Sequence, residues 1–467
     1  MNLSNLEGYK AFSLEEVEKK LKKYSSDLNR ITINDVKQKV AEINKYENFS
    51  SLRNPNPKDI LIIEQKGITQ AEKTVLSGRF FWEHAAAGEA TRLGLGTKYQ
   101  LMLNEFSVEK LRQMITCEYV EDSVSKGIKL EEAEKQAKEK FSEENILQEM
   151  TCNPQELEQL SLGTRHMLQM SFDVAKLAKK HNIGVSEVLA KQKMLVILNE
   201  QTSNRIAEEF ESWNFFGIPK KNILFMVQKS FHGMQLEEGR LFYDEDSPLR
   251  LHNHGQMAMQ KCSENSLFLQ GEYISFNEYL TTLSQMTDML SYNIEDLEYL
   301  TSAIDLESLG CALELGKNGY EMVMEVVSQN QYRPQKGGAC MHDSKLDKVI
   351  MLETNRLGSI KYDEIRYLNK NFNHYPNPSK SMAALREKGL NMQFDVKEHE
   401  GKEHIYPCPV QGDINFLVKT AFVMRRELKP IHNLKSPATM PAAVAAMKKQ
   451  DMQEGFLEFA DKIKEGI

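Results

Sequence analysis

The sequence contains few cysteines, and none of them has the spacing of a metal site or a disulfide framework. Six cysteines are scattered over 467 residues, and no two of them form a C-x-x-C pair. Structural zinc sites and disulfide-rich folds need cysteines at short or regular spacings. The spacing therefore argues against both and fits a reducing compartment.

Long apolar runs are also absent. No stretch reaches the roughly 20 apolar residues that a membrane-spanning helix needs. The first residues, Met1–Ser4, show neither the basic start nor the apolar run of a secretory signal. We therefore expect a cytoplasmic protein with no membrane partner, although an effector exported by a non-classical route would have the same features.

The chain has no excess of positive charge. The formal net charge is -8, with 41% hydrophobic and 27% charged residues. This composition is typical of a soluble globular protein and argues against nucleic acid as a partner, while it still permits a local basic pocket for phosphates. The length allows one large α/β core with smaller additions, or two to three domains.

Two well-known glycine loops are missing as well. No G-x-x-x-x-G spacing ends in Lys-Ser or Lys-Thr, which excludes a P-loop, and Gly94 and Gly96 lack the third glycine of a G-x-G-x-x-G loop. A nucleotide site, if present, must be of another kind.

The stretch Phe80–Lys98 carries the strongest local signal. It begins with bulky residues typical of a buried strand, continues through the small residues Ala85–Gly88, and then presents Thr91, Arg92 and Lys98. Small residues let backbone N–H groups approach a ligand, and Arg and Lys add charge suited to a polyphosphate. A strand that leads into such a loop is a usual nucleotide-binding position in open α/β folds. A tight strand-to-helix connection with a core arginine is the alternative interpretation.

Two strand–helix units follow further along the chain. Met194–Leu198 and Ile223–Gln228 are continuous apolar runs, which is typical of strands covered on both faces. A helical pattern through Ile206, Phe210 and Trp213 lies between them. Right-handed connections between such units predict a doubly wound sheet.

These segments resemble those of a known family. Ala85–Gly94 resembles the L-x-G-G-x-G-T-R-L-G loop of the UDP-sugar pyrophosphorylases, with Ala87 and Ala90 in place of two glycines. Phe215–Gln228 is similar to the family's Y-F-G…F-x-x-Q segment and follows in the same order. The resemblance implies an α/β fold with a GT-A-like (Rossmann-like) mixed-sheet nucleotidyltransferase core. It also implies a loop that wraps the triphosphate of UTP.

A third segment resembles the part of these enzymes that approaches uracil and ribose. Pro248–Gln256 is similar to the family's P-x-G-H-G-D stretch, with Asn253 replacing a glycine and Gln256 replacing the acid. The H-x-H letters that end at His254 also fit a metal site, but two histidines in a loop without a third ligand argue against one. The nucleotide contacts that the resemblance implies are Ala86, Ala87, Gly88, Glu89, Thr91, Gln228, His254 and Gly255.

Two neighbouring acids lie in a further segment that matches the family. Ser291–Leu297 is similar to the family's N-x-D-N-L segment, and Glu295 takes the position of the acid that holds the metal. The resemblance implies Mg²⁺ as the cofactor, because this ion prefers oxygen ligands and needs only one or two protein carboxylates. A pair of acids at the start of a helix is the alternative interpretation of Glu295 and Asp296.

The last matching segments imply contacts to the sugar and the phosphates. Lys336 precedes two glycines, and Glu353 follows the apolar run Val349–Leu352, as in the family's K-G-G segment and its strand ending in Glu. The resemblance implies catalytic roles for Arg92, Lys98 and Lys336, and sugar contacts from Glu353 and Asn373. A basic group from Arg425 to Lys429 occupies the place of a family phosphate contact, but on its own residues it fits a solvated patch.

We expect three regions along the chain. Residues 1–75 read as a helical N-terminal region, in which Ser13 and Glu16 form a capping box. Residues 76–429 would form the catalytic domain, with a polar helical insertion at about 104–160 that presents either a solvated face or a partner surface. Residues 430–467 read as a short helical C-terminal segment.

The resemblance therefore implies a uridylyltransferase that forms a UDP-sugar and pyrophosphate from UTP and a sugar 1-phosphate. The alternative is a catalytically impaired protein that binds a nucleotide or a UDP-sugar on the same fold, because Ala87, Ala90, Gln256 and Glu295 all depart from the family pattern. The identity of the sugar and the oligomeric state do not follow from these residues.

Overall fold

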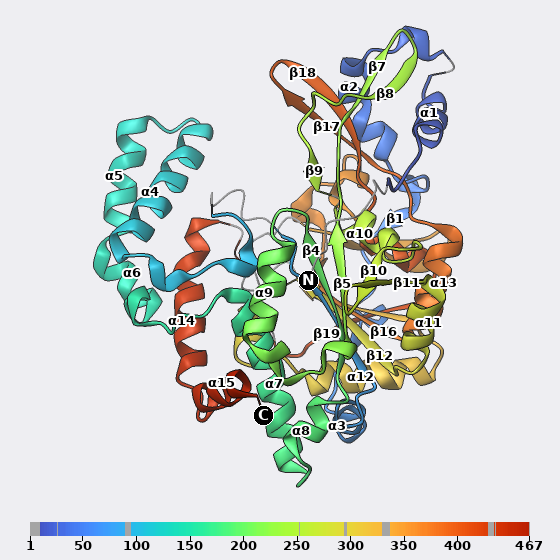
Figure 1. Cartoon of the computed structure of the whole chain (residues 1–467). Helices are drawn as coiled ribbons and strands as arrows, with labels where there is room; N and C mark the ends of the chain where they lie inside the picture. The colour runs from blue at the N-terminus through green and yellow to red at the C-terminus, as the bar shows by residue number, and fades with distance from the viewer. Residues whose placement is uncertain are drawn as a thin grey trace.

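One large mixed β-sheet organises the protein (Figure 1). The computed structural model describes residues 10–25, 27–88, 95–251, 253–293, 297–328, 337–427, 434 and 436–466. Over these residues the strand order is β11-β10-β5-β4-β3-β12-β16-β13-β19-β2, with β1, β14 and β15 paired beside this path. The strands of this sheet are β1 Leu52–Arg53, β2 Leu61–Ile62, β3 Phe80–Ala85, β4 Lys193–Asn199, β5 Ile223–Gln228, β10 Leu267–Leu269, β11 Glu272–Ile274, β12 Asp288–Asn293, β13 Met322–Ser328, β14 Ala339–Asp343, β15 Lys348–Leu352, β16 Tyr367–Pro376 and β19 Thr420–Met424.

The centre of the sheet is parallel. Strands β5, β4, β3 and β12 run in the same direction as neighbours, and β16 runs antiparallel between β12 and β13. Every residue of β5 is buried, and so is every residue of β4 after Lys193. These continuous apolar runs form strands because helices cover both faces of the sheet. The predicted strands and the predicted α/β fold class are confirmed.

Helices cover the two faces of the sheet. One face packs against α3, α7, α8, α9, α12 and α15, and the other packs against α10, α11 and α13. The bounds of these helices are α3 Ile68–Leu76, α7 Leu162–Lys180, α8 Val185–Leu189, α9 Ser203–Ser212, α10 His254–Gln260, α11 Phe276–Ser284, α12 Leu306–Lys317, α13 Pro378–Lys388 and α15 Phe456–Glu465.

A buried hydrogen-bond chain joins α12 to the sheet. His374 of β16 is paired through Nδ1 with Asp288 of β12 at 2.6 Å, and its Nε2 lies 3.1 Å from Ser308 Oγ of α12. All three side chains are buried. Burial of polar groups is tolerated here because each has a partner, so the chain fixes the position of α12 on the sheet.

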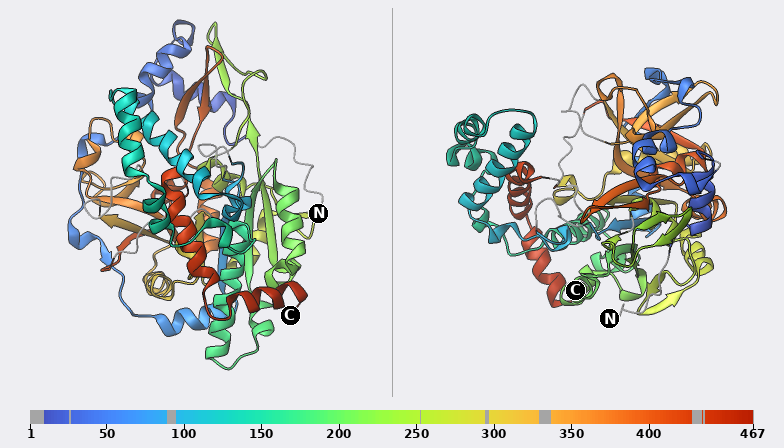
Figure 2. Two further views of the ribbon diagram at one scale, coloured as in Figure 1. Left: turned by 90° about the vertical axis from the view of Figure 1, so that its left-hand side faces the viewer. Right: turned by 90° about the horizontal axis from the view of Figure 1, so that it is seen from above.

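A helical lobe stands beside the sheet (Figures 1 and 2). It consists of α4 Val108–Ser125, α5 Leu130–Lys140, α6 Glu143–Met150 and α14 Met440–Asp451. Apolar residues of α4, α6 and α14 form one cluster with those of the short helix η9, Leu297–Leu300. The polar segment predicted to be helical thus forms α4 to α6, and the C-terminal helix α14 completes their packing.

A smaller lobe contains a four-stranded sheet and the first two helices. Its elements are α1 Leu14–Lys22, α2 Ile33–Asn44, β7 Met234–Glu237, β8 Arg240–Tyr243, β17 Phe394–His399 and β18 Lys402–Pro407, and their apolar side chains form a common cluster. The predicted capping box of Ser13 and Glu16 is present at the start of α1. A two-stranded ladder of β6 Ser230–Phe231 and β9 Arg250–Leu251 completes the strands of the described residues.

Candidate active site

The candidate site lies at the edge of the sheet where its parallel strands end. In the strand register, Asn293 pairs with Ala85, and Asn199 pairs with Gln228. The carboxyl ends of β12, β3, β4 and β5 therefore lie side by side. Ligands of open α/β sheets bind outside this edge, so the strands that precede the predicted glycine loop and the predicted metal segment end in the expected place.

The start of the predicted glycine loop is held by backbone hydrogen bonds. Ala86 N donates to Ile197 O at 2.8 Å, and the Asn199 side chain donates to Ala87 O at 3.1 Å. Lys98 N donates to Gly88 O at 3.0 Å and so joins the two described ends of the loop. The exposed backbone at Gly88 is where a ligand can approach the main chain most closely.

The methyl group of Ala87 belongs to the core. Ala87 is 2% exposed and is part of the apolar cluster that contains Phe81, Met226 and Met257. A Cβ that faces the core leaves the ligand side of the loop unobstructed. The replacement of a family glycine at this position is therefore accommodated by the core.

Helix α10 covers the end of β5. The Gln260 side chain donates to Val227 O at 2.8 Å, next to the buried Gln228, and its Oε1 accepts from Lys229 N at 3.3 Å. Since an α-helix rises about 1.5 Å per residue, the start of α10 at His254 lies about 9 Å along the axis from Gln260. Asn253 and Gln256, which flank His254 and Gly255, line one cavity together with Ser230, two residues after Gln228.

The N-terminus of α10 explains two departures from the family motif. Asn253 Oδ1 accepts hydrogen bonds from Gly255 N and Gln256 N, and Gln256 Oε1 accepts from Asn253 N at 2.9 Å. This capping box satisfies N–H groups that have no acceptor within the helix. An Asn-x-x-Gln pattern is the signal that would have predicted the start of a helix here, where the sequence interpretation saw a loop.

A crevice of about 700 Å³ opens beside α10. Its walls include Glu200 after β4, Ser230 after β5, Asn253 and Gln256 of α10, and Tyr406 of β18. The crevice therefore lies between the edge of the large sheet and the smaller lobe. Its size matches that of a small-molecule site, which typically measures about 300 to 1,000 Å³.

Charged and polar groups of the crevice are held in place by contacts with one another. Lys229 Nζ lies 3.3 Å from Glu200 Oε1, and the Arg250 guanidinium lies 4.9 Å from the centre of the Tyr406 ring. Burial raises the pKa of the Cys408 thiol to about 12, and the nearby charge of Asp395 adds to this shift. Cys408 is therefore an uncharged residue in the wall of the crevice at physiological pH.

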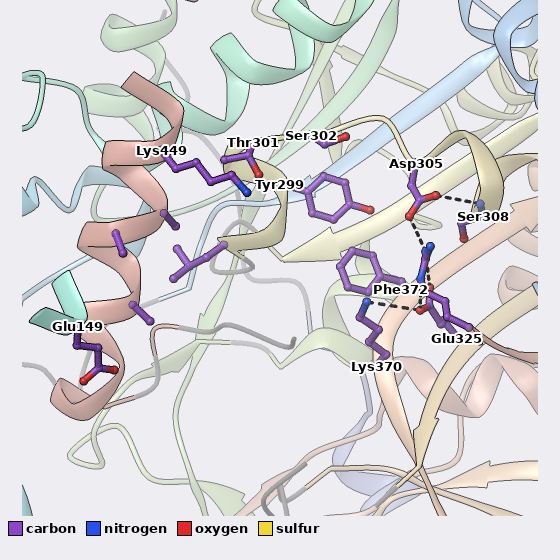
Figure 3. A pocket seen from close by; sticks show the side chains of 15 residues that line it. Glu149, Tyr299, Thr301, Ser302, Asp305, Ser308, Glu325, Lys370, Phe372 and Lys449 are labelled. Carbon is purple, nitrogen blue, oxygen red and sulfur yellow. Dashed lines mark hydrogen bonds and ion pairs between the residues drawn. The ribbon is translucent and has the colours of Figure 1, made fainter. Parts of the chain in front are cut away.

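A second cavity of about 560 Å³ lies on the other side of the edge, between α14 and the sheet (Figure 3). Tyr299 of η9 and Phe372 of β16 stack with ring centres 5.1 Å apart. At its inner end Arg425 Nε donates to Glu325 at 2.7 Å, and the same guanidinium also donates to Asp305. Lys370 Nζ lies 3.4 Å from Glu325.

The charges at the inner end of this cavity compensate one another. Burial alone would lower the pKa of Arg425, but Glu325 and Asp305 outweigh it and raise this pKa above its usual range. Arg425 is 7% exposed. The interpretation of this residue as part of a solvated basic patch is therefore wrong, because two carboxylates compensate its charge in the interior.

Several residues of the predicted site lie outside the described residues. These are Glu89, Thr91, Arg92, Glu295 and Lys336, and their roles stay predictions. Asn373 is described, and it lies buried in the interior of β16, where it pairs with Ser291 and lines neither cavity. Its predicted sugar contact also stays a prediction.

Among the described residues, no group of three or more His, Cys, Asp or Glu side chains is arranged to hold a metal ion. In this part of the chain, no helix has both the length and the apolar character that a membrane crossing requires.

Comparison with known proteins identifies the fold. The structure is similar to that of the uridine diphosphate N-acetylglucosamine pyrophosphorylase from Trypanosoma brucei, determined in complex with an inhibitor, with a TM-score of 0.58 and 14% identity over 97% of this chain and 85% of that one. The fold is that of the UDP-sugar pyrophosphorylases.

Two mutants of the UDP-glucose pyrophosphorylase from Leishmania major are also similar. One has a TM-score of 0.51 and 12% identity over 88% of this chain and 75% of that one. The other, in complex with UDP-glucose, has a TM-score of 0.51 and 10% identity over 89% of this chain and 76% of that one. No protein-family model and no curated protein matches the sequence.

Proposed function

We propose that the protein is a uridylyltransferase that forms a UDP-sugar and pyrophosphate from UTP and a sugar 1-phosphate. The observation that carries this proposal is the likeness of the fold, over 97% of the chain, to a UDP-N-acetylglucosamine pyrophosphorylase. A crevice at the carboxyl ends of β4 and β5, lined by Glu200, Ser230 and Gln256, supports it.

In the proposed reaction an oxygen of the sugar 1-phosphate attacks the α-phosphorus of UTP. The new P–O bond forms as the bond to the β-phosphate oxygen breaks, and pyrophosphate leaves with that electron pair. No covalent intermediate with the protein is needed. Catalysis comes from alignment of two anions and from compensation of their charge.

The residues have separate proposed roles. The backbone of Ala86, Ala87 and Gly88 follows the triphosphate, together with Glu89 and Thr91 further along the loop. Gln228, His254 and Gly255 contact the uridine, and Glu353 and Asn373 contact the sugar. Arg92 and Lys98 stabilise the departing pyrophosphate, and Lys336 stabilises the charge between the reacting phosphates.

We propose Mg²⁺ as the cofactor and Glu295 as its protein ligand. When bound, the ion compensates the negative charge of the phosphates. Magnesium keeps most of its ligands as water or phosphate oxygens, so a single protein carboxylate fits it.

The alternative is a binding protein that has lost turnover. Two of the departures that suggested it now have structural explanations, because the methyl group of Ala87 packs in the core and Gln256 caps α10. These two observations favour the active enzyme. The departures at Ala90 and Glu295 lie outside the described residues.

The proposal is tested by measuring pyrophosphate release from UTP, Mg²⁺ and a panel of sugar 1-phosphates. We expect release with at least one sugar, and a loss of at least about tenfold in turnover for Arg92→Ala and for Lys336→Ala, because each removes a positive charge from the transition state. The exposed Lys345, in the turn between β14 and β15, provides the control variant Lys345→Ala, which should keep the wild-type rate. Binding of UTP without release for any sugar would favour the binding protein instead.

A further inference from the structure

The cavity between α14 and the sheet shares no lining residue with the crevice beside α10. One of its walls is aromatic, formed by Tyr299 and Phe372. The facing wall is formed by Ala442, Ala445 and Ala446 of α14. Alanine leaves room for a ring next to the aromatic wall, and a volume of about 560 Å³ is sufficient for a small molecule.

The positive charge of this cavity is concentrated near its outer end. At the inner end, Arg425 and Lys370 face Glu325 and Asp305, so two positive and two negative charges cancel. Lys449 of α14 differs, because no ion pair joins it to a carboxylate among the described residues, and it is exposed. Figure 3 shows its ammonium group directed toward Thr301 and Tyr299, whereas Glu149 lies at a distance from it.

A threonine lies next to this ammonium group. Thr301 lines the cavity beside Lys449, and Ser302, whose hydroxyl donates to Ile304 O at 3.4 Å, lines it further along. Hydroxyl donors together with a lysine suit a phosphate, since lysine binds phosphate as a point charge. The aromatic wall suits the flat face of a ring, either the C–H face of a sugar or a nucleobase.

We propose that this cavity is a second binding site, for a phosphorylated ring compound, separate from the crevice of the proposed reaction. The phosphate contacts Lys449 and Thr301, and the ring lies on Tyr299 and Phe372. A sugar phosphate and a nucleoside monophosphate share this chemistry. A ligand in this position bridges the helical lobe, through α14, to η9 at the edge of the sheet. Binding of a ligand in this cavity therefore couples the helical lobe to the edge of the sheet.

The test is a calorimetric titration of the full-length protein with glucose 1-phosphate, uridine 5′-monophosphate and inorganic phosphate. We expect a component of ring-phosphate binding that Lys449→Glu weakens by at least about tenfold, because a charge-assisted contact is lost. Ala445→Trp, which fills the space before the aromatic wall, should remove the same component. Lys448→Glu is the matched control on the adjacent position of α14, since Lys448 faces Glu156 at 3.9 Å, and it should leave binding within about twofold.

Each outcome has a distinct meaning. Dependence on Lys449 for only one of the two ring compounds identifies the class of ligand. If inorganic phosphate bound as tightly as the two ring compounds and depended equally on Lys449, recognition of the ring would be refuted. Unchanged binding of all three probes in Lys449→Glu and Ala445→Trp would overturn the proposal. Pyrophosphate release by these two variants reports separately on the proposed function, so the two proposals fail independently.

Discussion

Lys20 is a lysine whose ammonium group is partly buried, which disfavours its charged form. It extends from α1 and donates to the carbonyl oxygen of Met392, and its ammonium group lies 5.1 Å from the centre of the Phe394 ring. Burial, followed by the charge of Arg356, lowers the pKa of Lys20 to about 8. The folded protein therefore releases this proton more readily than the unfolded chain does.

This pKa predicts a pH dependence of stability. Between about pH 8 and the ordinary lysine pKa near 10.5, the unfolded state binds more protons, so the free energy of unfolding should rise with pH by up to ~3 kcal/mol from this group. Lys20→Met should remove that rise, while Lys22→Met, at an exposed lysine of the same helix, should keep it. Urea unfolding of the three proteins from pH 7 to 10.5 measures the difference. Parallel curves for wild type and Lys20→Met would contradict the prediction.

Helix α10 shows how one element depends on a close backbone contact. A Cβ added to Gly255 would lie 2.0 Å from the carbonyl oxygen of Pro409 and 2.5 Å from Val410 N. Backbone atoms cannot move aside as a flexible side chain can. The position of α10 beside the crevice therefore requires glycine here.

We expect Gly255→Ala to lower the free energy of unfolding by about 1 to 3 kcal/mol, because overpacking against backbone outweighs the gain in helix propensity. Gly412→Ala is the control in the neighbouring short helix η13, Gln411–Phe416, where the nearest atom would lie at 3.8 Å. Urea unfolding measures both variants. If Gly255→Ala were as stable as Gly412→Ala, the close contact would not govern the position of α10.

At the scale of the whole molecule, the C-terminal helices lock the helical lobe to the core. Arg165 of α7 is fully buried, and its guanidinium donates to both carboxylate oxygens of Asp451, at the end of α14. Phe172 of the same helix packs against Phe456 and Phe459 of α15. The last residues of the chain thereby hold one wall of the second cavity in place.

Asp451→Asn should lower the free energy of unfolding by about 3 to 5 kcal/mol, because it leaves the charge of Arg165 buried without its partner. The double change Arg165→Met with Asp451→Leu should recover most of this loss, since it removes both charges. Asp461→Asn, at an exposed acid of α15, is the control. Guanidinium unfolding separates these cases, and a loss below about 1 kcal/mol for Asp451→Asn would show that water or another group solvates Arg165.

The parts of the fold that could be predicted are those with a local signal. Strands β4 and β5 were predicted from their continuous apolar runs, β3 from its bulky first residues, and the start of α1 from its capping box. Helix α10 was missed because it has only seven residues and begins with polar ones, although the Asn253 and Gln256 pair was visible.

The second cavity could not be predicted because its walls come from distant parts of the chain. Tyr299, Phe372 and Ala445 are brought together only by the packing of η9, β16 and α14. The same reason explains the wrong interpretation of Arg425, whose compensating carboxylates at Glu325 and Asp305 are 100 and 120 positions away in the sequence. No local pattern contains such contacts.

The pairing of the edge strand β2 has a consequence for synthesis. Leu61 pairs in parallel with Val423, and Ile62 pairs with Met424. A ribosome releases the chain from its N-terminus, so β2 emerges long before its partner β19, and contacts between such distant positions form slowly. This border of the sheet therefore closes only after β19 has been translated, long after β2. A nascent chain stopped before β19 leaves Leu61 and Ile62 without the strand that receives them.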